Sequence, residues 1–244
     1  MNRMTAFAVR TAKEIVRDPL NIAFGLGFPV TVLLLLTAIQ ANIPVSLFEL
    51  DRLTPGITVF GLSFLTLFSA TLIARDRESA LLPRLYTTPL TGADFIFGYA
   101  LPLLPLGVAQ AAICYLVALP LGLKPTWSIL WATAAVLPVV LLYVALGLLC
   151  GSVFNVKTVG GICGAGLTNL SAWLSGVWFD LNLVGGAFKK IAEALPFLHA
   201  VEWTRAVLAG DAAQALSHLW WVLGYTAVLL AVAVAAFLRQ MRRD

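Results

Sequence analysis

The sequence predicts an all-α integral membrane protein with six transmembrane helices, and three observations support this class. The chain has 244 residues, 60% of them apolar, with a mean hydropathy of +0.92, whereas soluble domains are about 45–50% apolar. Apolar runs of about 20 residues recur, long enough to cross a hydrocarbon core of about 30 Å as helices. Strand-like alternation is absent, and backbone groups in lipid need partners within their own segment. We therefore expect one transmembrane domain over residues 1–244.

The six predicted spans cover residues 20–39, 55–74, 95–119, 128–149, 159–179 and 219–238. With a cytoplasmic N-terminus, eleven of the 16 Lys and Arg residues fall in inner segments and five in outer ones. The positive-inside rule then places both termini in the cytoplasm, which requires an even number of spans. We expect a multi-pass protein of the inner (plasma) membrane.

Two further segments flank the spans. In residues 1–19, Arg3, Arg10, Lys13 and Arg17 fall within one sector of about 80° on a helix. This phasing favours an interfacial helix on the inner leaflet, because a plain basic flank would not need its charges in phase. Residues 180–217 contain apolar pieces too short to span, which predicts short outer re-entrant or interfacial helices before span six.

Small residues and prolines predict how the spans pack. Gly147/Gly151 and Gly160/Gly164 each form a G-x-x-x-G step that lets helices approach closely. Prolines within spans three and four predict kinks, and these are Pro102, Pro105 and Pro138. Three cysteines lie inside apolar runs and are expected to be packing residues, namely Cys114, Cys150 and Cys163.

Several function classes conflict with the sequence. The spans lack Asp, Glu, Lys, Arg and His away from their ends, whereas ion-driven transporters usually need ionisable groups there. No phosphate-binding G-x-x-x-x-G-K-[ST] pattern occurs. The net charge of +4 comes mostly from the chain ends and favours contact with membrane lipids over nucleic acid. We expect this chain to bind no cofactor.

An intramembrane enzyme is the alternative outside transport. Ser175 with His199 or His218 would be its nucleophile and base, but both histidines lie in the outer loop or at the start of span six. His199, Glu202 and Arg205 could share a helical face, yet a zinc site needs more ligands. We predict no catalytic and no metal-binding residue.

Span five carries an unusual polar series, made of Thr168, Asn169, Ser171 and Ser175. Asn169, Trp173 and Gly176 fall on one helical face. These residues either line a pathway or bond across to another helix, and the sequence leaves both readings open.

The connection at residues 75–94 is highly charged for so apolar a chain. Its large apolar residues would form one side of a short helix, and these are Leu81, Leu82, Leu85 and Tyr86. Arg77 and Arg84 lie on another side, and Thr88-Pro89 ends the helix. Such a helix can press its apolar side into a groove on a partner protein.

This connection resembles the loop after the second span in type-2 permease subunits of ATP-binding-cassette exporters. The matching elements are Arg75 to Ser79, Leu81 to Leu85, and Thr87-Thr88-Pro89-Leu90. The similarity extends over the whole chain, including Leu195, Pro196 and Arg205. Two positions differ: Pro83 replaces a helix-forming residue, and Asp180 replaces a proline.

The resemblance implies a transport subunit that is not itself an enzyme. It implies a homodimer or close heterodimer bound to two copies of an ABC ATPase subunit, which carry the ATP and Mg. The coupling helix would contact the ATPase through Arg77, Glu78, Leu81, Leu82, Leu85, Tyr86, Thr88 and Pro89. Substrate would pass between the permease copies along Ser63, Thr66, Asn169 and Trp173. Such a path suits an amphipathic, drug-like or lipid-like cargo, and a glycan or lipid-linked saccharide is the alternative.

Leu85→Glu tests the coupling helix. Burying a leucine is worth about 1.5–3 kcal/mol, and a buried charge adds a desolvation penalty. We expect weaker ATPase binding or uncoupled ATP hydrolysis with normal membrane insertion, measured by co-purification and cargo-stimulated hydrolysis. Ser79→Glu, on the predicted exposed side, should have little effect. Unchanged binding and stimulation in Leu85→Glu would refute the assignment.

Overall fold

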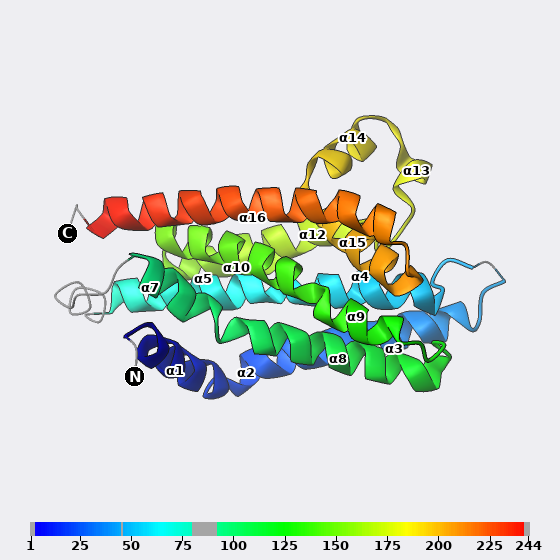
Figure 1. Cartoon of the computed structure of the whole chain (residues 1–244), viewed down its shortest axis with the longest axis horizontal. Coiled ribbons are helices and arrows are strands. Elements are labelled where there is room, and N and C mark those ends of the chain that lie inside the picture. Colours follow the sequence, from blue (N-terminus) through cyan, green and yellow to red (C-terminus); the bar gives the residue numbers. More distant parts are fainter. Residues whose placement is uncertain (1–2, 45, 80–91, 242–244) are drawn as a thin grey trace.

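The computed structural model describes residues 3–44, 46–79 and 92–241, and these fold into an elongated helical bundle without a β-strand among them (Figure 1). The first half contains α1 (Arg3–Val16), α2 (Pro19–Ile22), the π-helix η1 (Ala23–Gly27), α3 (Phe28–Gln40), α4 (Leu50–Leu62), α5 (Phe64–Glu78), α7 (Gly92–Ala100) and α8 (Leu103–Leu121). The second half contains α9 (Ser128–Ala134), α10 (Val136–Val153), α11 (Val156–Val159), the π-helix η2 (Gly160–Leu167), α12 (Thr168–Leu174), α13 (Leu181–Val184), α14 (Gly186–Ala194), α15 (Pro196–Ala209) and α16 (Ala212–Met241).

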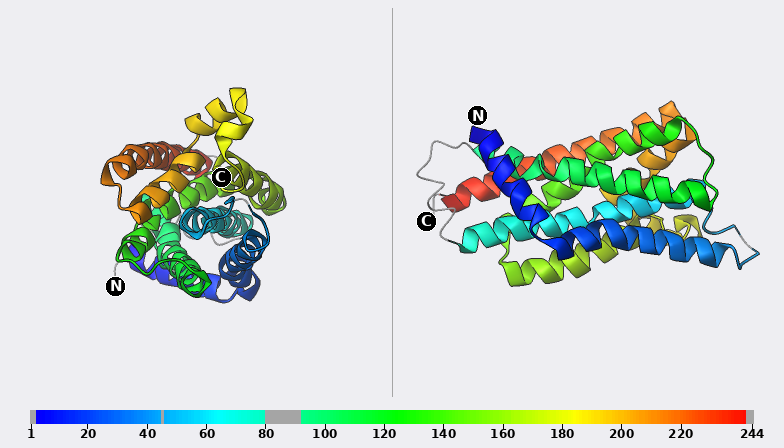
Figure 2. Two further views of the ribbon diagram at one scale, coloured as in Figure 1. Left: turned by 90° about the vertical axis from the view of Figure 1, so that its right-hand side faces the viewer. Right: turned by 90° about the horizontal axis from the view of Figure 1, so that it is seen from below.

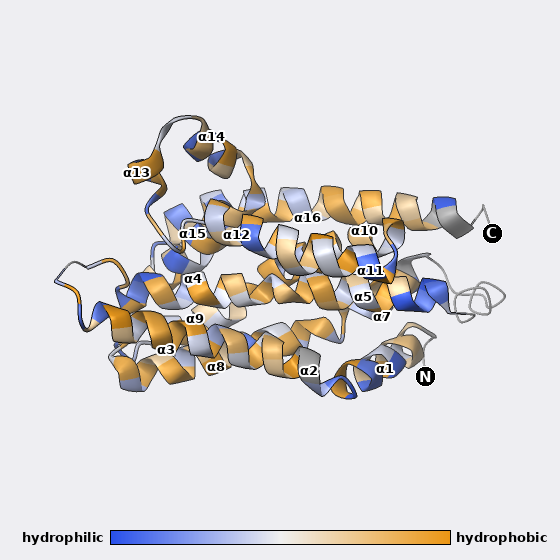
Figure 3. Ribbon diagram, turned by 180° about the vertical axis from the view of Figure 1, so that it is seen from behind, coloured by the Kyte–Doolittle hydropathy of each residue, from blue (hydrophilic) through white to orange (hydrophobic). Residues whose placement is uncertain are grey.

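Five helices in the described part of the chain are long and apolar enough to cross a membrane. They cover Ala23–Gln40, Leu50–Glu78, Asp94–Leu121, Ser128–Val153 and Ala212–Phe237. Apolar residues run along the middle of the bundle, and hydrophilic residues gather on α1 and at the end of α5 (Figure 3). The predicted all-α membrane class therefore agrees with the fold.

The predicted fifth span is also helical. Helix runs without interruption from Val156 through η2 to Leu174, and this segment packs along α5. It is not among the five strongly apolar helices, because Lys157, Asn169 and several glycines lower its hydropathy. The π-helical turns coincide with its glycine-rich stretch, residues 160–167. The sixth crossing stays a prediction.

Prolines break the long helices where their rings collide with the preceding turn. α9 ends at Ala134, four residues before Pro138, and α10 starts at Val136. The boundary between α7 and α8 likewise falls at Leu101 and Pro102, four residues before Pro105. Spans three and four are thus interrupted close to the prolines that predicted kinks there.

Close packing of α10 on α5 forms the centre of the bundle. A Cβ added at Gly147 would overlap the Ser69 hydroxyl and lie 2.5 Å from the carbonyl oxygen of Thr66. A Cβ at Gly151 would lie 2.6 Å from the carbonyl oxygen of Ala70. The first G-x-x-x-G step is thus a close internal contact. The second step packs less closely, because an added Cβ at Gly160 meets nothing within 4 Å and one at Gly164 would make an ordinary contact with the Leu67 side chain at 3.4 Å.

The two ends of the bundle differ. The N- and C-terminal helices reach the same end (Figure 1), where α1 crosses the bundle obliquely (Figure 2, right). α1 packs on α7 through Phe7, whose ring lies 5.0 Å from that of Tyr99 in an edge-to-face arrangement. Helices α13 and α14 stand away from the bundle near the opposite end (Figure 1), which we call the outer end.

Gly147→Ala tests the α5–α10 contact. The added methyl group has no space beside Ser69 and Thr66, so the helices must separate, and overpacking costs about 1–3 kcal/mol. We expect a lower melting temperature of the purified protein in detergent. Gly160→Ala is the matched control and should melt like the wild type. Equal melting temperatures for both variants would contradict the close contact.

Candidate functional site

The last residues of α5 hold the turn between α10 and α11. Arg77 donates from Nη1 to the carbonyl oxygens of Gly151 at 2.7 Å and Phe154 at 3.2 Å. Glu78 accepts through Oε1 from the backbone N–H of Val156 at 2.9 Å. A helix C-terminus leaves carbonyl groups unpaired and favours a cation, and an N-terminus favours an anion. Both side chains thus satisfy helix ends within this chain.

The other residues predicted to contact an ATPase lie outside the described residues. They are Leu81, Leu82, Leu85, Tyr86, Thr88 and Pro89. Arg77 and Glu78 are the predicted coupling residues that the structure places, at the end of α5 immediately before residues 80–91. Residues 75–79 and α7 form the two roots of that segment.

A buried carboxylate joins both roots to α1. Asp76 is 3% exposed, and it accepts two hydrogen bonds from the Arg10 guanidinium, at 2.5 and 2.7 Å. Tyr99, from α7, donates its hydroxyl to the same carboxylate at 2.7 Å. We call Asp76, Arg10 and Tyr99 the Asp76 cluster. It was not predicted from the sequence, and it connects three helices that are distant in the chain.

Neighbouring charges shift the pKa values of residues in and next to the cluster. The hydrogen bond that Arg10 donates to Asp76 raises the pKa of Arg10 above its ordinary value, despite partial burial of the guanidinium. Arg10 also pairs with Glu14 at 2.7 Å. Burial raises the pKa of Glu14, and Arg10 opposes this shift. A longer pair, Arg75 with Asp18 at 3.8 Å, adds a second link between α5 and the turn after α1.

The basic residues predicted to share one sector of α1 therefore have different surroundings. Arg10 turns into the bundle toward Asp76, whereas Lys13 and Arg17 are exposed. The in-phase pattern could not separate these roles, because one helical sector faces both the protein and the surface.

The residues predicted for the substrate path fall into two groups. Ser63 and Thr66 are buried, and they donate to the carbonyl oxygens of Phe60 at 2.6 Å and Tyr143 at 2.9 Å. Asn169 is exposed and bonds to Ala165 in its own helical segment at 2.7 Å, and Trp173 is 54% exposed. Within this one chain the two groups do not share a surface.

The polar series in the predicted fifth span shows both behaviours left open by the sequence. Ser171 bonds across to α10, with 2.5 Å between its hydroxyl oxygen and that of Tyr143. Asn169 and Trp173 instead face outward. Thr168 and Ser175 donate to backbone carbonyls of the same segment, at 2.9 and 3.1 Å.

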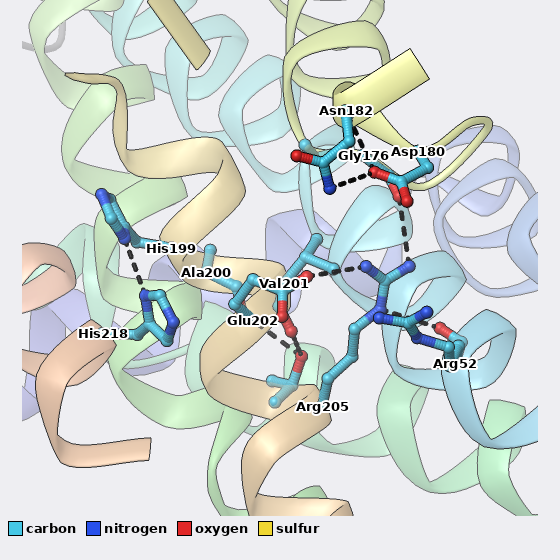
Figure 4. Close-up of polar contacts among 12 residues, drawn as sticks. Arg52, Gly176, Asp180, Asn182, His199, Ala200, Val201, Glu202, Arg205 and His218 are labelled. Carbon is cyan, nitrogen blue, oxygen red and sulfur yellow. Dashed lines mark hydrogen bonds and ion pairs between the residues drawn. The ribbon is translucent and has the colours of Figure 1, made fainter. Parts of the chain in front are cut away.

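Arg205 organises the outer end (Figure 4). It pairs with Glu202 at 2.8 Å, and it donates to the carbonyl oxygens of Arg52 at 3.1 Å and Gly176 at 3.2 Å. It thereby ties α15 to α4 and to the turn after α12. The Arg205–Glu202 pair also lines an open cavity of about 400 Å³, together with Arg52 and Lys124.

His199 does not join that pair, although the three-residue spacing placed it on the same helical face. Its Nδ1 lies 2.8 Å from Nδ1 of His218, and its Nε2 lies 2.9 Å from the carbonyl oxygen of Glu193. Among the described residues, no three His, Cys, Asp or Glu side chains are grouped to hold a metal.

Asp76→Asn tests the Asp76 cluster. The change removes the negative charge that pairs with Arg10, and a hydrogen bond to a charged group is worth about 1.5–3 kcal/mol. We expect a lower melting temperature and faster hydrogen exchange in α1. Asp18→Asn is the control and should cost at most about 1 kcal/mol, because its pair is long and partly exposed. Similar effects of the two variants would argue against the cluster.

Comparison with known families agrees with this architecture. The family model described as ABC-2 type transporter matches residues 3–209, which include α1, the roots of segment 80–91 and α15. A search of curated proteins found no match. The long apolar helices make the chain a multi-pass membrane protein. The chain belongs to the ABC-2 type transporter family and is a permease subunit of an ABC transporter.

Proposed function

We propose that the chain is the membrane-spanning subunit of an ATP-driven exporter that moves an amphipathic, drug-like or lipid-like substrate outward. ABC-2 permeases normally work with an ABC ATPase, and ATP and Mg would be bound there. The Asp76 cluster carries the proposal, because it fixes both roots of segment 80–91 to each other and to α1.

A segment that docks on an ATPase needs rigid roots to transmit movement. On one side, Asp76 connects α5 with α1 and α7. On the other side, Arg77 and Glu78 connect α5 with the α10–α11 turn. A displacement of segment 80–91 by the ATPase would therefore reach α1, α7 and α11 together. Coupling through Leu81, Leu82, Leu85, Tyr86, Thr88 and Pro89 remains part of the proposal.

We infer six crossings, with both termini in the cytoplasm. The two terminal helices reach the same end of the bundle (Figure 1), and a chain with ends on one side crosses an even number of times. The helical segment from Val156 to Leu174 supplies a sixth crossing beside the five strongly apolar helices. Lys13, Arg17, Arg75 and Lys157 belong to the predicted cytoplasmic segments, as the positive-inside rule requires. α1 would then lie on the lipids of the inner leaflet.

A second permease copy would complete the substrate path. Gly160 and Gly161 have open space where a Cβ would be, and Asn169 and Trp173 are exposed on the same helical segment. This outward stripe is a surface on which a second copy could lie. Mixed polar and apolar character there suits an amphipathic cargo. A glycan or lipid-linked saccharide remains the alternative, since exposed aromatic residues such as Trp173 also bind sugars.

Transport by the chain and its ATPase, reconstituted in vesicles, tests the function. Collapse of the proton gradient at constant ATP should leave efflux of an amphipathic dye unchanged, because the predicted spans lack ionisable groups away from their ends. Omission of ATP should abolish efflux. Loss of efflux on collapse of the gradient would favour an ion-coupled mechanism, and the alternative saccharide cargo would be recognised if it stimulated hydrolysis while amphipathic dyes did not.

A further inference from the structure

Two histidines meet where α16 begins beside α15, at the outer end of the bundle (Figure 4). His199 is 7% exposed and His218 is partly buried. Their Nδ1 atoms are 2.8 Å apart. The Trp221 ring stacks on His199 at 4.7 Å, with 9° between the ring planes. Stacking on Trp221 and the contact with Glu193 therefore hold His199 in one orientation.

The neighbouring groups determine which nitrogen carries each proton. Nε2 of His199 lies 2.9 Å from the carbonyl oxygen of Glu193. A carbonyl oxygen only accepts, so Nε2 of His199 carries the hydrogen. In the neutral ring, Nδ1 of His199 must then accept, and Nδ1 of His218 must donate.

The distance between the two Nδ1 atoms fits a hydrogen bond in which the rings share one proton. Two nitrogen ligands on a tetrahedral zinc ion, each at about 2.0–2.1 Å from the metal, lie about 3.3 Å apart. The observed 2.8 Å is shorter and matches a hydrogen bond. The pair therefore binds protons rather than a metal in this geometry.

The number of protons on the two imidazoles determines whether the contact between their Nδ1 atoms can form. One added proton leaves a single hydrogen between the two Nδ1 atoms and gives a charge-assisted bond. A second added proton places an N–H on both Nδ1 atoms, so that two donors and two positive charges face each other. The contact must then open.

We propose that His199 and His218 form a pH-sensitive latch between α15 and α16, closed at neutral pH and open when both imidazoles are charged. This role goes beyond transport itself and does not depend on the ATPase.

The surroundings of His199 set the pH range. Burial lowers the pKa of His199 below 6.5, and the Glu193 carbonyl group opposes this shift. The charge of His218 lowers the pKa further, whereas the carboxylates of Glu193 on α14 and Glu202 on α15 raise it. A histidine with a lowered folded-state pKa contributes stability above about pH 6.5, and this contribution is lost as the pH falls through the lowered value.

Opening would release the first turns of α16 rather than α15. Two residues hold α15 to the rest of the bundle. Arg205 donates to the carbonyl oxygen of Arg52. The indole N–H of Trp203 donates to the carbonyl oxygen of Ala135 at 2.6 Å. Farther along α16, the Tyr225 hydroxyl donates to the carbonyl oxygen of Ala194. The movable part is therefore the segment from Ala212 to His218. Acidification on the outer side would loosen that end of the bundle while the cytoplasmic end stays unchanged.

Two variants of His218 test the latch in the full-length protein in lipid nanodiscs. His218→Asn keeps an N–H donor close to the position of Nδ1 but cannot be charged. His218→Ala removes the contact at every pH. Melting temperatures are measured between pH 7.5 and 5, and hydrogen exchange of residues 196–222 is measured at both limits with correction for the intrinsic rate.

On acidification the melting temperature of the wild type should fall by about 2–4 °C more than that of His218→Asn. A shift of this size is expected when a chain of this length loses one contact. Exchange should rise in residues 212–218 of the wild type alone. His218→Ala should melt lower at pH 7.5 and show no additional loss. An identical pH dependence of the wild type and His218→Asn would overturn the proposal, and this comparison stands even if His218→Ala fails to fold.

Discussion

The buried carboxylate of Asp76 is the interaction on which the architecture of the end that holds α1 and the C-terminus depends. A charge at 3% exposure is tolerated only with close partners. Arg10 and Tyr99 provide these partners from α1 and α7, so neither helix can leave α5 without exposing an unpaired charge. The same contact fixes the two roots of segment 80–91. One electrostatic requirement thereby orders the part of the permease that is proposed to meet the ATPase.

Different forces hold the middle and the ends of the bundle. In the middle, α5 and α10 approach closely because Gly147 and Gly151 have no side chains, and Thr66 bonds directly to the carbonyl oxygen of Tyr143. At the outer end, Arg205 satisfies backbone carbonyls of two other elements. Small residues thus lie where these two helices touch, and Arg205 lies where backbone carbonyl groups accept its hydrogen bonds.

Residue patterns explain which predictions agree with the structure. Runs of apolar residues are local and long, so the five long helices and the proline breaks at Ala135 and Leu101 followed from the chain alone. The G-x-x-x-G pattern predicted close approach at both steps, but only Gly147 and Gly151 lie against the backbone of another helix. Gly160 faces open space, because the pattern states that approach is possible and not which face of the helix is turned inward. The coupling residues from Leu81 to Pro89 stay predictions.

The sequence by itself determined the membrane class, the helical elements and a charged connection after the second span, because hydropathy and periodicity act over neighbouring residues. Tertiary structure alone decided which charges became partners. Asp76 meets Arg10 across 66 positions of the chain, and His199 meets His218 rather than Glu202 and Arg205 on its own helix. Side chains on one helical face can still turn to different neighbours. The packing of α1, α5 and α7, and of α15 on α16, determines which hydrogen-bond partner each of these buried polar side chains meets.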